Sequence, residues 1–126
     1  MSSRELGPDT RARNSAMRLL ARREHSRAEL RGKLVGRGFE NDSVEELLQG
    51  LEDQDLLSDE RFAMSLIASR AETGYGPKRI DLELRNRGVS EELAREALAK
   101  AEVDWGQQGT DQAVRKFGSD PAQTFP

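Results

Sequence analysis

The sequence predicts an all-α protein of tandem three-helix repeats, two complete and a third incomplete, stacked into an elongated and curved body. Three observations support this fold class. Apolar residues recur at helical spacing, serines and glycines stand where helices should start and stop, and residues 16–23 share five of eight positions with residues 63–70. The expected divisions are a flexible N-terminus (1–11), repeat 1 (12–57), repeat 2 (58–103), and the first helix of a third repeat with a loose tail (104–126).

The first repeat opens with an apolar stripe that predicts a helix from about Ala12 to about Glu24. Ser26 and Glu29 have the spacing of a capping box, which predicts the start of the second helix. Gly36 and Gly38 offer the conformational freedom that ends a helix.

A second capping box, Ser43 with Glu46, is expected to start the third helix, which should end near Gln54.

The second repeat follows the same plan. Ser58 is placed to cap the fourth helix, and Gly74 ends it before Pro77, a residue suited to the first position of the fifth helix. Gly88 should end that helix, and Ser90 should cap the sixth. After the first helix, the equivalent core positions are offset by 50 residues. No segment has the pattern expected of a strand.

Composition and charge narrow the functional classes. The chain of 126 residues is 35% hydrophobic and 34% charged, with a net charge of -3 and no cysteine. This favours thin helical layers in a reducing compartment, and we expect a cytoplasmic protein without a membrane-spanning segment or a signal peptide. Residues 11–37 carry nine basic and two acidic residues, whereas residues 38–60 carry nine acidic residues and no basic one. One face could therefore bind an anionic partner, although ordinary solvated helix faces explain the pattern about equally well.

The sequence gives little support for an enzyme. The single histidine, His25, has no cysteine or second imidazole to complete a metal site, so a structural role is expected. The many carboxylates have no evident apolar pocket that would raise a pKa. No phosphate loop or nucleophile elbow is present. We expect no enzyme activity, no cofactor and no metal.

The sharpest local feature runs from Gly74 through Arg79. Free amides at a helix start, with Lys78 and Arg79 beside them, could hold a phosphate or a carboxylate, and Tyr75 could stack on a base or a partner side chain. A plain glycine cap followed by proline explains everything except the two basic residues. Both interpretations stay open at this point.

Several segments together resemble the RecX family of regulators of the RecA recombinase. The resemblance covers roughly residues 12–117 and rests on residues 20–30 (LARREHSRAEL), 37–39 (RGF), 56–63 (LLSDERFA), 74–77 (GYGP) and 87–88 (RG). It implies a non-catalytic protein that binds along the groove of the RecA filament on DNA. We expect the protein to be a monomer. Such a protein would chiefly inhibit the ATPase and strand exchange of RecA in recombination, DNA repair and the SOS response. Family members typically complete a third repeat, so a chain with only its first helix should bind filaments more weakly.

On this interpretation, basic helix faces lie toward DNA phosphates, single- or double-stranded, or toward acidic surfaces of the filament. The candidate contacts are Arg22, Arg23, Arg27, Arg31, Arg37, Arg70, Tyr75, Lys78, Arg79 and Arg87.

Two other functions stay open. A helix-turn-helix transcription regulator is the first, but its recognition helix would be acidic and would be repelled by phosphates. The second is a helical adaptor for a different protein.

Overall fold

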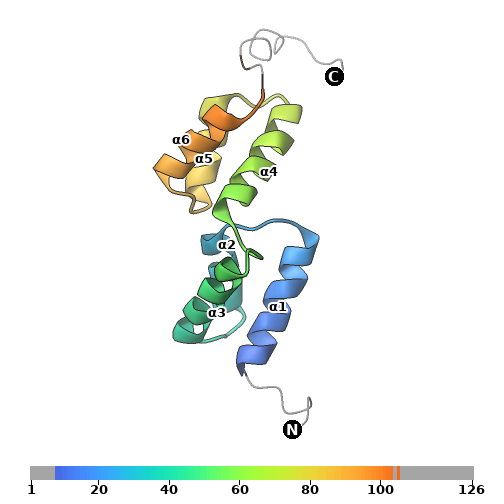
Figure 1. Ribbon diagram of the computed structural model, residues 1–126, viewed down its shortest axis with the longest axis vertical. Helices are drawn as coiled ribbons and strands as arrows, with labels where there is room; N and C mark the ends of the chain where they lie inside the picture. The colour runs from blue at the N-terminus through green and yellow to red at the C-terminus, as the bar shows by residue number, and fades with distance from the viewer. Residues whose placement is uncertain (1–7, 104, 106–126) are drawn as a thin grey trace. The chain divides into compact units, whose positions relative to one another are not determined.

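The computed structural model describes residues 8–103 and 105, and within this part it contains six α-helices and no strand (Figure 1). The helices are α1 (Pro8–Arg22), α2 (Arg27–Gly36), α3 (Asn41–Asp53), α4 (Asp59–Glu72), α5 (Pro77–Asn86) and α6 (Glu91–Lys100). The all-α prediction and the two three-helix repeats are confirmed. Apart from Trp105, the expected third repeat lies outside the described residues.

The helices belong to two compact units. One holds α1 to α3 and the chain as far as Phe62, together with the turn Arg87–Val89, and the other holds Ala63–Asn86 and the chain from Ser90 onward. None of the helices among the described residues is both long enough and apolar enough to cross a bilayer.

The core of the first unit lies where α1, α2 and α3 contact one another. The buried side chains of this core are Ala16, Leu19, Leu30, Leu34, Val44, Leu48, Leu51 and Leu57. Phe39 packs partly buried against them, as the sequence predicted. Burying each leucine fully stabilises the unit by roughly 1.5–3 kcal/mol, so this core fixes the positions of the polar side chains described below.

The second unit has a core of smaller side chains. The buried residues in this unit are Ala63, Leu66, Ile67, Ala71, Ile80, Leu84, Ala94 and Ala97. α5 and α6 contact each other directly. On α5 only Ile80 and Leu84 are buried, so most of that short helix is accessible.

The predicted helix boundaries are mostly confirmed. Ser26 accepts a hydrogen bond from the Glu29 amide while Glu29 accepts one from the Ser26 amide, which completes the capping box. The hydroxyls of Ser58 and Ser90 cap α4 and α6 by accepting from the amides three residues on. Gly38, Gly74 and Gly88 adopt φ angles of 97°, 92° and 93°, the left-handed conformation expected of them.

Two expected boundaries were wrong. α3 begins at Asn41, and its N-cap Glu40 makes no side-chain cap hydrogen bond, so Ser43 and Glu46 form no capping box. Ser43 is the third residue of the helix, so the amide three residues after it, that of Glu46, lies where the intrahelical hydrogen bonds already begin and needs no cap. α1 begins at Pro8, four residues before Ala12, because the fixed φ of proline suits a first helical turn.

Candidate interaction surface

The ten candidate contacts separate into two groups. Five arginines are engaged in ion pairs within the chain: Arg23, Arg27, Arg31, Arg70 and Arg87. The other candidates are Arg22, Arg37, Tyr75, Lys78 and Arg79. Among the described residues, no ion pair involves the four cations of this second group.

The basic side of α2 is neutralised by the acidic helix α3. Arg27 donates through Nη2 to Glu45 Oε1 at 2.9 Å and through Nη1 to Glu52, and Arg31 Nε donates to Glu45 Oε2. Hydrogen bonds from Arg27 and then Arg31 lower the pKa of Glu45, and the bond to Glu45 raises the pKa of Arg27. The charge of these two arginines is therefore balanced within the chain, because α3 packs directly against α2. Their role as contacts stays a prediction.

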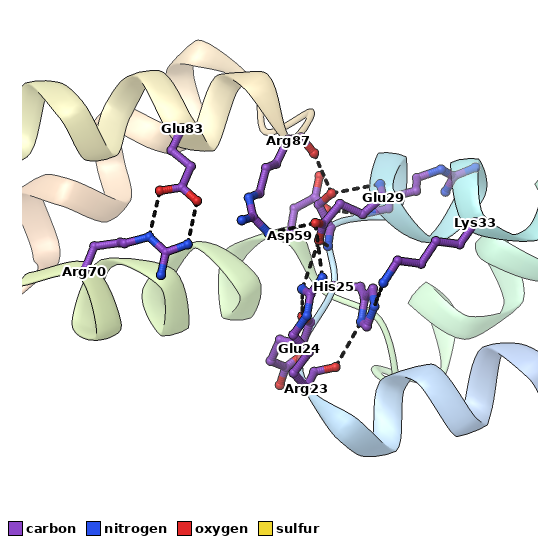
Figure 2. A network of polar contacts seen from close by, with 11 residues as sticks. Arg23, Glu24, His25, Glu29, Lys33, Asp59, Arg70, Glu83 and Arg87 are labelled. Atoms are coloured by element: carbon purple, nitrogen blue, oxygen red, sulfur yellow. Dashed lines mark hydrogen bonds and ion pairs between the residues drawn. The ribbon is translucent and has the colours of Figure 1, made fainter. Parts of the chain in front are cut away.

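Glu29 is the centre of a second polar network in the first unit (Figure 2). Its carboxylate accepts from Arg23 Nη1 at 3.2 Å and from Arg87 Nη1 at 2.9 Å. Ser26 Oγ donates to the carbonyl of Arg87 at 2.6 Å, so the cap serine also holds the turn Arg87–Val89. Burial raises the pKa of Glu29, but the hydrogen bonds from Arg23 and Ser26 and the charges of both arginines outweigh it, and the net pKa is lowered.

His25 lies beside this network and is 1% exposed. Its Nδ1 is 3.0 Å from the carbonyl of Arg23, and its Nε2 is 3.0 Å from Lys33 Nζ (Figure 2). A carbonyl only accepts and an ammonium only donates, so the imidazole is neutral, with the proton on Nδ1. Burial, reinforced by the charges of Arg23 and Lys33, lowers the pKa of His25. The structural role predicted for His25 fits these contacts.

No cluster of three or more metal-ligating side chains occurs among residues 8–103.

The sequence analysis did not single out Arg61, which lies on α4. It donates to Glu24 Oε2 at 2.8 Å and to Asp55 Oδ1 at 3.2 Å.

In the second unit, Arg70 and Glu83 form a bidentate pair, with Nε–Oε1 and Nη2–Oε2 distances of 2.8 and 2.7 Å (Figure 2). The hydrogen bond to Glu83 raises the pKa of Arg70. The Arg79 guanidinium carbon lies 3.8 Å from the centre of the Tyr75 ring, a close cation–π contact. Arg70 is committed to its pair, whereas Arg79 and Tyr75 form an accessible surface at the start of α5.

The four candidate cations without an ion pair among the described residues are exposed side chains at helix ends or turns. Arg22 ends α1, Arg37 follows α2, and Lys78 and Arg79 lie in the first turn of α5. Such side chains can meet an anionic surface without first breaking an internal pair. The sequence alone did not separate these four cations from the paired arginines, because the acidic partner of a paired arginine lies up to 58 residues away in the chain.

The acidic third helix also bears on the transcription-regulator alternative. α3 carries no basic residue in its last turn, and its Glu45 and Glu52 are occupied by Arg27. A recognition helix lies between rows of DNA phosphates, and α3 has no Lys or Arg to favour that position. Nothing in the described helices favours that function.

Comparison with known proteins matches both repeats to one family. Residues 12–51 match the model of the first three-helix domain of RecX, and residues 58–98 match that of the second. The chain is 43% identical to the regulatory protein RecX of Cronobacter sakazakii over 127 residues, covering 93% of this chain and 77% of the relative. It is 47% identical to the regulatory protein RecX of Halorhodospira halophila over 107 residues, a match that covers 85% of this chain and 66% of the relative.

Among solved structures, the crystal structure of RecX from Lactobacillus salivarius is similar to this chain, with a TM-score of 0.69 and 29% identity. The match covers 73% of this chain and 60% of that one. The chain thus spans well under the full length of that structural relative.

Proposed function

Because the chain belongs to the RecX family, we propose that it regulates the RecA recombinase by binding the RecA filament on DNA and chiefly inhibiting ATP hydrolysis and strand exchange. The observation that carries this proposal is the match of both three-helix repeats to the two RecX domains, with 43% identity to a named regulatory protein over 93% of the chain. Action in the cytoplasm and as a monomer is part of the proposal.

The proposed mechanism is binding without catalysis. Arg22, Arg37, Lys78 and Arg79 are exposed and carry charge that no acidic side chain of the described residues neutralises, so they are the proposed contacts with phosphates or filament carboxylates. The paired arginines instead stabilise the units that present these contacts. Binding of this kind weakens as salt rises, because counterions compete for the same charges.

The test is RecA ATPase activity on single-stranded DNA, measured with increasing amounts of the protein. We expect inhibition that saturates and that lessens at higher salt. Arg37→Glu should shift the inhibition curve to higher concentration by about fivefold or more, whereas Arg18→Glu, with the same charge change on an exposed residue of α1, should shift it by about twofold or less. Absence of inhibition at large molar excess would overturn the proposal.

A further inference from the structure

The outer face of α5 combines an exposed leucine with basic side chains. Leu82 is 52% exposed, and it is the large hydrophobic residue left open among the described residues. It stands two positions from Ile80 and two from Leu84, which are buried, and two positions rotate a helix by about 200°. Leu82 therefore points directly away from the core.

The charged residues of α5 divide into neutralised and free ones. Asp81 is paired with Arg85 at 3.1 Å, and Glu83 is paired with Arg70. Lys78 and Arg79, one turn before Leu82, have no acidic partner among the described residues, so the acids of α5 do not cancel their charge.

Tyr75 extends this surface at its N-terminal end. Its ring is half-buried and lies against Arg79, which fixes the position of that guanidinium. Lys78, Arg79 and Leu82 lie within α5, and Leu82 stands three and four positions after the two cations, the spacing that places side chains on one side of a helix. Tyr75 lies in the turn before α5 and joins them through its ring contact with Arg79. We call these four residues the α5 outer stripe.

Single exposed leucines are common on protein surfaces, but the α5 outer stripe differs from its counterpart in repeat 1. With the offset of 50 residues, Lys78, Arg79 and Leu82 correspond to Ala28, Glu29 and Gly32. Glu29 is occupied by Arg23 and Arg87, and Gly32 has no side chain to offer. The basic and apolar character is therefore particular to repeat 2.

We infer that the α5 outer stripe docks on an acidic protein surface that carries an apolar side chain for Leu82. Tyrosine and arginine are enriched among the residues that dominate protein–protein affinity, and the buried centre of an interface is more apolar than its rim. Two free cations beside the leucine select carboxylates around that contact by charge complementarity. A DNA backbone would satisfy the cations but would leave Leu82 without a partner. The inference rests on the proposed function in one respect: the filament's protein surface, not its DNA, is the proposed occupant.

The experiment measures binding to a RecA filament assembled on single-stranded DNA. Leu82→Ala should weaken binding by about fivefold or more with an unchanged dependence on salt. Lys78→Glu should weaken it by about tenfold and flatten the salt dependence. Arg18→Glu serves as the charge-matched control and should change affinity by about twofold or less, and circular dichroism should show that all variants keep their helical content.

Three results would overturn the inference. The first is a Leu82→Ala variant that binds like the unmodified chain. The second is an equal loss of affinity of the same variants for bare single-stranded DNA, which would place the stripe on phosphates. The third is self-association of the chain that Leu82→Ala abolishes, which would make a second copy the occupant.

Failure of the proposed function can be distinguished from failure of this inference. If the unmodified chain does not bind the filament, the stripe is tested alone by titrating the isotope-labelled chain with a short synthetic helix that carries leucine between glutamates. Chemical-shift changes centred on Tyr75, Lys78, Arg79 and Leu82 would support the inference. Changes elsewhere, or none, would contradict it.

Discussion

Replacing Gly88 with alanine should destabilise the first compact unit by about 2–5 kcal/mol. The residue has a φ of 93°, which costs an L-amino acid roughly 1–2 kcal/mol. A Cβ built at Gly88 would also overlap the Cβ of Ala28, in the first turn of α2. Overpacking of this kind adds typically 1–3 kcal/mol, because a backbone and a Cβ cannot turn aside as a long side chain can.

Gly38 is a matched control for this substitution. It occupies the equivalent turn of repeat 1 with a φ of 97°, but nothing lies within 4 Å of a Cβ placed there. Gly38→Ala should therefore cost only the backbone strain of about 1–2 kcal/mol. The difference between the two variants isolates the contact with Ala28.

Urea unfolding followed by far-ultraviolet circular dichroism measures both variants. Adding Ala28→Gly to Gly88→Ala removes the atom that the new Cβ would meet and leaves the Ala28 Cα at an ordinary 3.6 Å. The double variant should recover about 1–3 kcal/mol relative to additivity. Equal destabilisation by Gly88→Ala and Gly38→Ala, or no recovery in the double variant, would refute the described packing of the turn.

Three further changes test the polar side chains. Because the pKa of His25 is lowered from its ordinary 6.5, the unfolded chain takes up its proton first, so stability should fall as pH drops below about 6.5, and His25→Gln should remove this slope in urea titrations. Glu29→Gln should lower the free energy of unfolding by about 1–2 kcal/mol, because Arg23 and Arg87 lose their negatively charged partner. Exposed Glu46→Gln should change the free energy of unfolding by no more than about 0.5 kcal/mol, and thermal unfolding measures both variants. Lys78→Glu should flatten the dependence of filament affinity on salt concentration, because one charge facing acidic side chains is lost, and Arg18→Glu should leave that dependence unchanged.

Each of these three predictions can be contradicted by a specific result. If the stability of His25→Gln still falls below about pH 6.5, groups other than His25 cause the pH dependence. Equal effects of Glu29→Gln and Glu46→Gln would mean that the network around Glu29 contributes nothing measurable. A salt slope unaffected by Lys78→Glu would remove Lys78 from the interface.

The parts of the fold that the sequence predicted are those set by neighbouring residues. The capping box of Ser26 and Glu29 and the stop at Gly38 depend on contacts a few residues apart, so pattern alone located them. The same pattern at Ser43 was misleading, because serine and glutamate three residues apart also occur inside a helix.

The candidate surface was predicted less well, because charge in the sequence does not show which charges are paired. Arg27 meets Glu45 and Glu52 only when α3 packs on α2, and Arg87 reaches Glu29 across 58 residues of chain. Leu82 could have been found from its helical phase relative to Ile80 and Leu84. Its significance became visible only once the ion pairs around it were known.

The most direct test of the central claim is co-sedimentation of the unmodified chain with RecA filaments on single-stranded DNA, with RecA ATPase measured in the same samples. We predict that the chain pellets with the filament, that ATP hydrolysis falls in proportion to the bound amount, and that salt weakens both effects together. A chain that stays in the supernatant at large excess, or that pellets without any change in ATP hydrolysis, would contradict the proposed regulation of RecA.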